Sequence, residues 1–444
     1  MALSLVLSAC APAATPTPQV IVQTQIVEVQ GTPQVQEVVV TATPAPEQPA
    51  VKEKVLRINL GTWPDVIDPQ KSSFVNEIAH LKLIYEGLTK FNTKLETVPG
   101  NAESWEYSDD LMTLTFTLRD GLKYSDGSLL NAKRFEYALL RNINPETAGE
   151  YASITDEILG APEWRGCDAA TEGACEAAAA VVAERVKATL ADGAACADYE
   201  DAACNTLTIK LSKPAPYFHT IMGIWVVFPA KEELIAEGGD DWWTSSKYQV
   251  GNGPFVWTSL EPAVRSLFTP NANYWQGAPK VSIEYSYIVD SAVAIEAYKN
   301  DEFDIVASAG EAFDAIESDP ELKAQHLVYP GSCTTVIKLG LKGVYTDPAG
   351  NQYDSPFNDP KVREAFYYAF DAEGWAQDVD AGLSTPTWTW IPPGYPGYDA
   401  EANATPQFDP EKARAALAAS SYGGPDALNA LGLKLTYGQS ARNQ

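Results

Sequence analysis

The sequence has few of the side chains that build metal sites and no loop that would hold a nucleotide. Its 444 residues include only three His, and neither an HExxH nor a CxxC motif occurs. Zinc sites depend on such closely spaced ligands, so we expect no metal and no other cofactor. The stretch Gly251-Asn-Gly253-Pro254 lacks the third glycine of a dinucleotide-binding loop, and its proline would block the helix that should follow.

Basic residues are scarce relative to acidic ones. Lys and Arg total 31 against 59 Asp and Glu, which gives a formal net charge of −28. Nucleic-acid binding depends on basic patches, so this balance excludes a nucleic-acid partner. No apolar run approaches the roughly 18 residues of a membrane-spanning helix. At about 150 residues per domain, the chain has room for two or three globular domains.

The N-terminus has the pattern of an exported protein. Residues 1–10 read MALSLVLSAC, which is an apolar stretch with small residues before Cys10. This resembles the remnant of a bacterial lipoprotein signal, although the basic start of such a signal is missing. We therefore expect lipidation of Cys10 and attachment of an extracytoplasmic protein to the membrane. An ordinary apolar N-terminus with a chance cysteine is the alternative.

The next segment is rich in proline and threonine. Residues 11–50 contain seven Pro and six Thr, and no aromatic or basic residue. Such a composition cannot build a core, so we expect an extended tether over residues 11–51. Pairing of its Val-rich patches as strands remains an alternative.

The rest of the chain mixes two hydrophobic periodicities, which predicts a multi-lobed α/β body. Alternation predicts strands at residues 55–60, 112–118, 206–211, 281–287 and 433–437. Helical spacing predicts helices at residues 76–88, 131–143, 176–191, 292–299, 359–370 and 409–419. The last two helices each start with Asp followed by Pro, a cap residue before a residue favoured in the first turn.

Four cysteines flank the Ala-rich helix predicted at residues 176–191. An extracytoplasmic compartment permits disulfides. A straight helix of this length is about 24 Å long, whereas residues 192–196 can span at most about 17 Å on the way back. A bridge between Cys175 and Cys196 is therefore disfavoured.

We accordingly predict the local pairs Cys167–Cys175 and Cys196–Cys204. The spacing of these cysteines does not suit a zinc site. Cys333 is left without a partner, and we expect it to be a buried free thiol or to lie beside a cleft.

Residues 102–127 carry a recognisable series of short blocks. They contain Ala-Glu-Ser-Trp, Ser-Asp-Asp, Thr-Phe-Thr-Leu-Arg-Asp-Gly and Ser-Asp-Gly, in that order. The series resembles the signature of the peptide/nickel class of extracellular solute-binding proteins, which supply ABC importers. Lys133 and Arg134 stand where that signature has two acids. Further blocks agree in family order: Tyr85–Thr89, Lys213–Phe218, Val250–Phe255, Asn273–Trp275, Phe357–Ala365 and Asp409–Ala413.

The resemblance implies an α/β fold of two lobes that close like a clamp, with an extra subdomain and mixed sheets covered by helices on both faces. We expect the first lobe at 52–99 and 206–331, and the subdomain at 100–205 with a Cys-stapled insertion at 160–205. The second lobe would occupy 332–444. The family's final part has no counterpart in this sequence, so we expect that lobe to be incomplete.

The resemblance also implies a function without catalysis. An extended oligopeptide would pair its backbone with strand edges in the cleft, and a permease and an ATPase would import it. The expected cleft residues are Ser73, Phe74, Val75, Ala307, Ser308, Ser332, Cys333, Thr334, Trp388 and Trp390. The acid that binds the peptide ammonium in relatives lies later in the family sequence, so it is not assigned here. We expect a monomer.

Two alternatives remain open at this point. The same fold could bind an oligosaccharide, which the 11 Trp and 21 Tyr would suit, or chelated nickel. A secreted glycoside hydrolase is the alternative of another class. It would need two facing carboxylates, and no spacing in the sequence favours such a pair.

Overall fold

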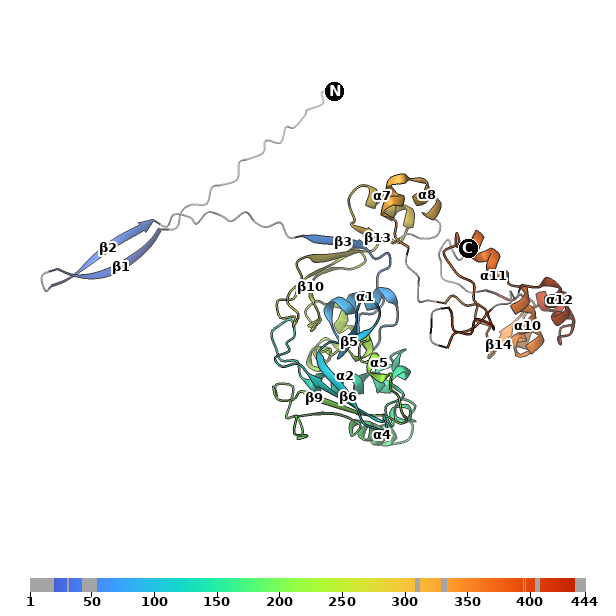
Figure 1. Ribbon diagram of the computed structural model, residues 1–444, viewed down its shortest axis with the longest axis horizontal. Helices are drawn as coiled ribbons and strands as arrows, with labels where there is room; N and C mark the ends of the chain where they lie inside the picture. Colours follow the sequence, from blue (N-terminus) through green and yellow to red (C-terminus); the bar gives the residue numbers. More distant parts are fainter. Residues whose placement is uncertain are drawn as a thin grey trace, which may run out of the picture. The chain divides into compact units, whose positions relative to one another are not determined.

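The structure is a computed structural model that describes residues 20–29, 32–41, 54–307, 312–328, 334–393, 395, 397–403 and 408–435. The chain forms two compact units, Met1–Lys54 and Val55–Gln444 (Figure 1). In the described ranges no helix is long and apolar enough to cross a membrane. Cys10 and the remnant at residues 1–10 lie outside the described residues.

Part of the proposed tether is a β-hairpin. Strand β1 (Val20–Val29) pairs antiparallel with β2 (Thr32–Thr41). The prediction of an extended segment is therefore wrong here, and the strand alternative is correct. The physical reason is composition, because the β-branched residues Val, Ile and Thr favour strands. Pro33 is tolerated because it lies one residue from the end of the ladder.

The central sheet of the second unit is mixed. Its order is β10-β11-β12-β3-β13, with β3 (Val55–Asn59) parallel to both neighbours and the other pairs antiparallel. Its remaining strands are β10 (Phe255–Glu261), β11 (Arg265–Pro270), β12 (Ser282–Ser286) and β13 (Ile305–Val306). Helix α1 (Val75–Ile84) packs on β10, and α7 (Ser291–Lys299) connects β12 to β13. Helix α1 and the strands β10, β11 and β12 enclose a core rich in aromatic side chains.

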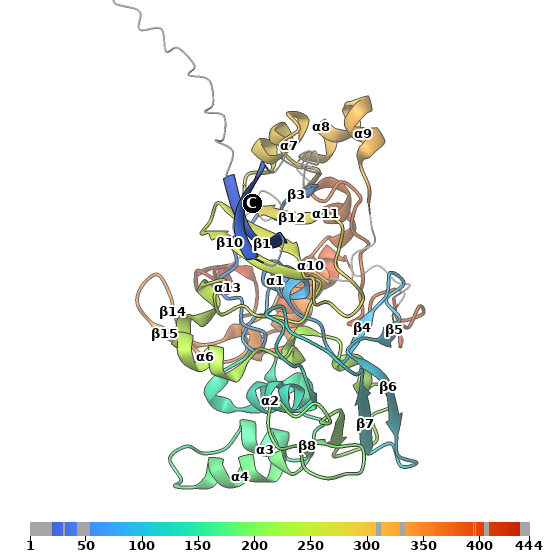
Figure 2. The ribbon, with the colours of Figure 1, turned by 90° about the vertical axis from the view of Figure 1, so that its left-hand side faces the viewer.

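The second sheet is antiparallel and belongs to the extra subdomain. Its order is β6-β7-β9-β8, and its strands are β6 (Ala102–Tyr107), β7 (Thr113–Leu118), β8 (Val186–Thr189) and β9 (Thr206–Lys210). In β7 the apolar residues Leu114, Phe116 and Leu118 alternate with Thr and are buried, as a one-sided strand requires. Helix α2 (Ala132–Ile143) lies against β8 and β9, and α3 (Ala161–Arg165) and α4 (Ala174–Ala183) follow it (Figure 2).

Two sequence-based boundaries differ from the structure. The Ala-rich helix ends at Ala183, because Val186-Lys-Ala-Thr189 alternates buried and half-buried side chains and pairs with β9. Strand β9 itself was expected in the first lobe, yet it lies between β7 and β8. The subdomain therefore extends past residue 205, because its sheet is completed by a strand that follows the insertion.

Two disulfides close short loops in this insertion. Cys167 is bonded to Cys175 and Cys196 to Cys204, each with a Cα–Cα distance of 5.3 Å. Cys204 is almost fully buried in the subdomain core. Because the helix is shorter than expected, the length argument against the nested pairing loses its basis, but the local pairs are those present.

The other described elements are short. Those within residues 89–244 are β4 (Thr89–Phe91), β5 (Thr97–Pro99), η1 (Pro145–Thr147), η2 (Ala152–Thr155), α5 (Phe218–Ile221), η3 (Trp225–Val227), α6 (Glu232–Gly238) and η4 (Gly239–Thr244). Toward the C-terminus they are α8 (Phe313–Ser318), α9 (Pro320–Gln325), β14 (Val344–Thr346), β15 (Gln352–Asp354), η6 (Pro356–Asn358), α10 (Pro360–Ala369), α11 (Ala372–Asp378), α12 (Pro410–Ala418) and α13 (Pro425–Asn429).

The two helices expected at Asp-Pro pairs are confirmed. Asp359 accepts a hydrogen bond from the Lys361 amide at 2.8 Å, and Asp409 accepts one from the Lys412 amide at 2.9 Å. Each helix begins at the following proline, and α10 packs against α12. The strand expected at residues 433–437 is absent from residues 433–435, and the rest of it lies outside the described residues.

A buried ion pair joins the loop after β3 to helix α2. Both oxygens of the fully buried Asp68 carboxylate accept from the Arg141 guanidinium at 2.6 Å, and Trp242 donates to it at 2.9 Å. Burial alone would raise the pKa of Asp68, but the hydrogen bonds and charge of Arg141 lower the pKa overall. The charged carboxylate therefore stabilises the fold at neutral pH.

We expect Arg141→Met to lower the free energy of unfolding by about 3–5 kcal/mol, because it leaves a buried charge without its partner. Urea denaturation at pH 7 measures this. The difference from wild type should shrink as the pH falls through the lowered pKa of Asp68, where the carboxylate becomes protonated. Arg165→Met is the matched control, because its pair with Asp156 is about one-third exposed and should contribute less than about 1 kcal/mol.

Candidate functional site

The carboxyl ends of three parallel strands meet at one edge of the central sheet. Strand β3 lies between β12 and β13 and runs parallel to both. Ligands of open α/β sheets bind outside such an edge. The segments that leave it are residues 60–75 after β3, residues 287–289 after β12 and Ala307 after β13.

A buried asparagine joins two of these segments. The Asn59 side-chain amide donates to the Ile288 carbonyl at 3.0 Å, and its oxygen accepts from the Ile288 amide at 2.8 Å. The same oxygen accepts from the Gly61 amide at 3.3 Å. The start of the loop after β3 therefore stays against the loop after β12.

The loop after β3 ends in two exposed apolar side chains at the start of α1. Phe74 is 58% exposed and Val75 is 79% exposed. The buried carboxylate of Glu77 holds this segment, because it accepts from the amides of Ser73 at 2.7 Å and Phe74 at 3.0 Å. Its other oxygen accepts from the Val66 amide at 3.2 Å. The exposure of Phe74 and Val75 therefore belongs to an ordered segment.

Only some of the backbone hydrogen-bonding groups around Phe74 have a partner in the described structure. Phe74 is extended, with φ −97° and ψ 152°. Its amide donates to Glu77, and its carbonyl accepts from the Ile78 amide at 3.0 Å. In an extended chain the Ser73 carbonyl and the Val75 amide point to the opposite side. Neither has a hydrogen-bond partner within the described part of the chain. One acceptor and one donor are therefore available to an incoming backbone.

The structure brings some of the expected cleft residues to this edge. Ser73 is half-buried, and Ala307 is exposed directly after β13, the neighbour of β3. Ser308, Ser332 and Cys333 lie outside the described residues. Thr334 is exposed, Trp388 is half-buried and Trp390 is 81% exposed, the last two in the loop after α11. Their part in ligand binding stays a prediction.

The residues that hold this edge were not among those predicted from the sequence. Glu77 follows Phe74 by three positions, and a glutamate three residues into a helix is the signal of a capping interaction. Asn59 gave no such signal, because a single asparagine at the end of a strand is unremarkable. Tyr287 and Trp63 pack edge to face at a ring-centroid distance of 4.8 Å, a contact that only the fold creates.

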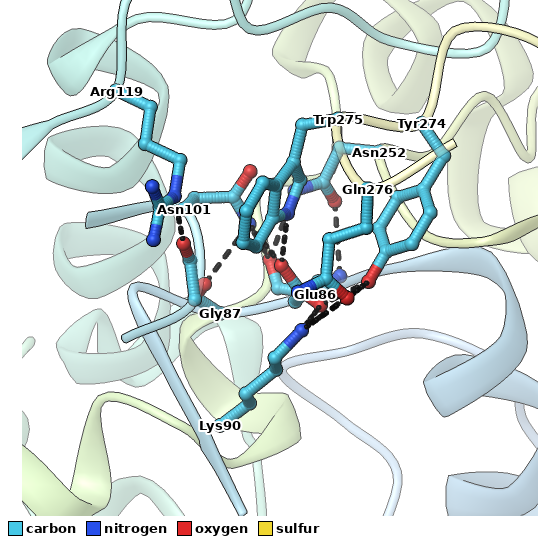
Figure 3. A network of polar contacts seen from close by, with 10 residues as sticks. Glu86, Gly87, Lys90, Asn101, Arg119, Asn252, Tyr274, Trp275 and Gln276 are labelled. Carbon is cyan, nitrogen blue, oxygen red and sulfur yellow. Dashed lines mark hydrogen bonds and ion pairs between the residues drawn. The ribbon is translucent and has the colours of Figure 1, made fainter. Parts of the chain in front are cut away.

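A second polar cluster surrounds Glu86, which is 7% exposed (Figure 3). Its carboxylate accepts from the Trp275 indole at 2.6 Å, the Tyr274 hydroxyl at 2.6 Å and the Lys90 ammonium at 3.1 Å. The Arg119 guanidinium lies over the Trp275 ring at 4.0 Å. Every close partner of the carboxylate is another side chain of the protein, so this cluster stabilises the fold.

The cluster explains several of the blocks that carry the family resemblance. The main-chain carbonyl of Glu86 accepts from the side-chain amides of Asn101 at 3.0 Å and Asn252 at 2.9 Å. A Cβ at Gly253 would lie 2.6 Å from the Ile84 backbone, so only glycine fits there. The blocks at residues 85–89, 250–255 and 273–275 thus meet in one place and serve packing.

No group of three or more His, Cys, Asp or Glu side chains in the described ranges could hold a metal ion. The strand-edge segment is the candidate functional site because it combines two exposed apolar side chains with backbone groups that can pair, and its chemistry is hydrogen bonding and apolar contact.

Comparison with known proteins places this fold in a class. The structure resembles that of the Escherichia coli murein tripeptide binding protein MppA, with a TM-score of 0.63, 24% identity and coverage of 84% of this chain and 68% of the other. It also resembles Haemophilus influenzae OppA in complex with RPPGFSPFR, with a TM-score of 0.61, 23% identity and coverage of 84% and 67%. The fold is that of the two-lobed periplasmic binding proteins, as the resemblance implied.

The family follows from the sequence. The model of the family described as bacterial extracellular solute-binding proteins, family 5 Middle, matches residues 96–444. The match covers more than half of the chain, and the chain belongs to this family.

Two curated relatives come from Escherichia coli (strain K12). The chain is 29% identical over 355 residues to the probable deoxycholate-binding periplasmic protein YgiS, and the match covers 79% of this chain and 59% of the relative. It is 28% identical over 403 residues to the periplasmic murein peptide-binding protein MppA, and this match covers 89% of this chain and 67% of that relative. The chain thus spans between 59% and 67% of the length of these two proteins.

We expect Glu86→Gln to lower the free energy of unfolding by about 2–3 kcal/mol. The side-chain NH2 of the new glutamine would point toward groups that are themselves donors. The remaining hydrogen bonds would also lose their charged acceptor, and bonds to a charged acceptor are stronger than bonds to a neutral one. Urea denaturation followed by the fluorescence of the 11 tryptophans measures the loss. Glu106→Gln is the control, because Glu106 is exposed on β6 and its change should stay within about 0.5 kcal/mol. Equal stability of the two variants would contradict a structural role for Glu86.

Proposed function

We propose that this protein binds oligopeptides at the segment Ser73–Val75 and delivers them to an ABC importer. The observation that carries the proposal is the Ser73 carbonyl and the Val75 amide on either side of an extended residue, neither of which has a partner among the described residues. Both groups face the same side of the backbone at Phe74. A peptide residue beside Phe74 can donate its amide to Ser73 and accept from Val75 with its carbonyl.

The occupied groups of Phe74 limit how a peptide can pair here. The amide and carbonyl of Phe74 are bonded to Glu77 and Ile78, so a peptide residue cannot exchange both bonds with Phe74 itself. The Ser73 carbonyl and the Val75 amide can bond to one residue of a parallel peptide, or to the two residues that flank the one opposite Phe74 in an antiparallel peptide. The peptide therefore pairs with this side of the segment, in either direction.

Binding through the backbone accepts many sequences. Main-chain hydrogen bonds supply affinity in β-augmentation, and side-chain pockets supply selectivity. Ser308, Ser332, Cys333, Thr334, Trp388 and Trp390 are proposed as further walls of the site. The net charge of −28 favours encounter with cationic peptides over anionic ones.

The finer parts of the proposal concern the cellular setting. We propose a monomeric, extracytoplasmic protein that is tethered to the membrane through lipid on Cys10. The partners would be a permease and its ATPase, which supply the transport step, so the protein itself catalyses no reaction. The relatives named periplasmic support the extracytoplasmic location. Digestion of the intact protein followed by mass spectrometry would detect the acyl groups.

No observation on the described residues favours an oligosaccharide, chelated nickel or glycoside hydrolysis. Native mass spectrometry of protein purified without refolding separates the ligand classes. We expect adducts that fragment as short peptides. Hexose-spaced adducts would move the function to sugar uptake, and a single steroid-sized adduct would point to an amphipathic anion.

The decisive variant is Val75→Pro. It removes one amide donor, and proline is favoured at the first position of a helix after an extended residue. We expect the variant to fold normally and to bind the tripeptide trilysine about tenfold more weakly, since one hydrogen bond is worth about 1–1.5 kcal/mol. Isothermal titration calorimetry measures the dissociation constant.

Val75→Ala is the matched control, because it removes the same side chain but keeps the amide. It should stay within about threefold of wild type. Equal weakening in both variants would assign the effect to the side chain and contradict backbone pairing at this residue.

A further inference from the structure

A histidine lies directly behind the candidate site, at the interface between α1 and the central sheet. His80 is fully buried. Its ring is surrounded by Trp257, Phe268, Tyr285 and Tyr287, at centroid distances between 5.1 and 6.1 Å. The side chain is therefore shielded from solvent by three neighbouring strands.

The hydrogen bonds of the imidazole determine its tautomer. Nδ1 lies 2.7 Å from the Asn76 carbonyl, which can only accept, so Nδ1 carries the proton. Nε2 lies 2.7 Å from the Tyr287 hydroxyl and, in the neutral ring, accepts from it. The Tyr287 hydroxyl also lies 2.7 Å from the Ser266 hydroxyl, toward which it can donate, so its one proton is shared between Nε2 and Ser266. The result is a chain of hydrogen-bond contacts from Ser266 through Tyr287 and His80 to Asn76.

Two members of this chain, Asn76 and Tyr287, lie at the candidate site. Asn76 is in the first turn of α1, next to Phe74 and Val75, and its side chain donates to the carbonyls of Thr62 at 3.3 Å and Trp63 at 3.1 Å. Tyr287 directly follows β12 and packs against Trp63. A break in the chain would therefore release the first turn of α1 from the sheet edge.

We propose that His80 is a positioning residue for ligand binding: its neutral imidazole ties the first turn of α1 to Tyr287 and so holds the Ser73–Val75 backbone against the carboxyl edge of the sheet. The inference rests on the proposed function, because it takes this backbone to be the peptide-binding segment.

The surroundings of the ring make its charge state sensitive to acid. Burial lowers the pKa of His80 to about 4. From β12 the titratable groups that face it are Tyr285 and Tyr287, and β10 and β11 present Trp257, Phe268 and Ser266. On α1 the nearby carboxylate of Glu77 is occupied by backbone amides. No charged partner in the described residues offsets an imidazolium, so protonation buries an uncompensated charge and turns Nε2 from an acceptor into a donor toward Tyr287.

The test compares two single-hydroxyl deletions on the same strand. Tyr287→Phe removes the donor to His80, whereas Tyr285→Phe removes a hydroxyl with no hydrogen-bond partner in the described structure and keeps the ring contact. The amide of Ile78 reports on the first turn, because it donates to the Phe74 carbonyl at 3.0 Å. Its hydrogen exchange is measured by NMR at pH 7 and pH 5.

We expect exchange at Ile78 to be about tenfold faster in Tyr287→Phe than in wild type or Tyr285→Phe. The His80 ring should titrate at a higher pH in Tyr287→Phe, since the neutral form loses the bond that favours it. Trilysine should bind several-fold more weakly to Tyr287→Phe by calorimetry and with unchanged affinity to Tyr285→Phe.

Identical exchange and identical His80 titration in the two variants would overturn the inference. Failure of trilysine and of mixed tripeptides to bind the wild type would contradict the proposed function instead. The exchange and titration results would then still decide whether His80 holds the first turn. A Tyr287→Phe protein with altered exchange but unchanged trilysine affinity would also overturn the positioning role.

Discussion

The parallel pairing of β3 with β12 and β13 is the constraint on which the central part of the structure depends. It brings residues 55–59 against residues 282–286 and 305–306. Residues 60–254, between β3 and β10, must therefore leave the sheet and return, and this excursion contains the entire antiparallel subdomain sheet. The same pairing also aligns three carboxyl ends, which creates the edge where Phe74 and Val75 are exposed.

Buried acidic groups hold the loops that leave this edge, in a chain with a large excess of acids. Asp68 pairs with Arg141, Glu77 accepts three backbone amides, and Glu86 accepts from Lys90, Tyr274 and Trp275. Each of these carboxylates is satisfied by hydrogen bonds, as burial of a charge requires. Only Asp68 and Glu86 have cationic partners, whereas Glu77 relies on backbone amides. The ordered loops are the condition for an ordered binding segment.

Local patterns predicted much of the secondary structure and less of the site. The alternation in β7 and the Asp-Pro starts of α10 and α12 depend on neighbouring residues alone, so they could be read directly. The helix after Cys175 was expected to be too long, because pairing of residues 186–189 with β9 outweighed their helical propensity. The hairpin at residues 20–41 was predicted only as an alternative. The prolines and the lack of aromatic residues favoured an unpaired tether, although the β-branched residues favour strands.

The binding edge was located only through the family resemblance, which pointed to Ser73–Val75 and Ala307. The contacts that hold it, from Asn59 to Ile288 and from His80 to Tyr287, span more than two hundred residues. No local sequence pattern predicts such contacts, because they exist only after the sheet has formed. The blocks at residues 85–89, 250–255 and 273–275, by contrast, pack around Glu86 and serve the packing of the fold.

The central claim is that a peptide backbone pairs with the Ser73 carbonyl and the Val75 amide. Amide hydrogen exchange at Val75, followed by NMR with and without saturating trilysine, tests it most directly. The account predicts that the Val75 amide, which has no acceptor among the described residues, exchanges at least about tenfold more slowly with peptide bound. The Phe74 amide, already bonded to Glu77, should change little. Unchanged exchange at Val75 in a protein saturated with peptide would contradict the account.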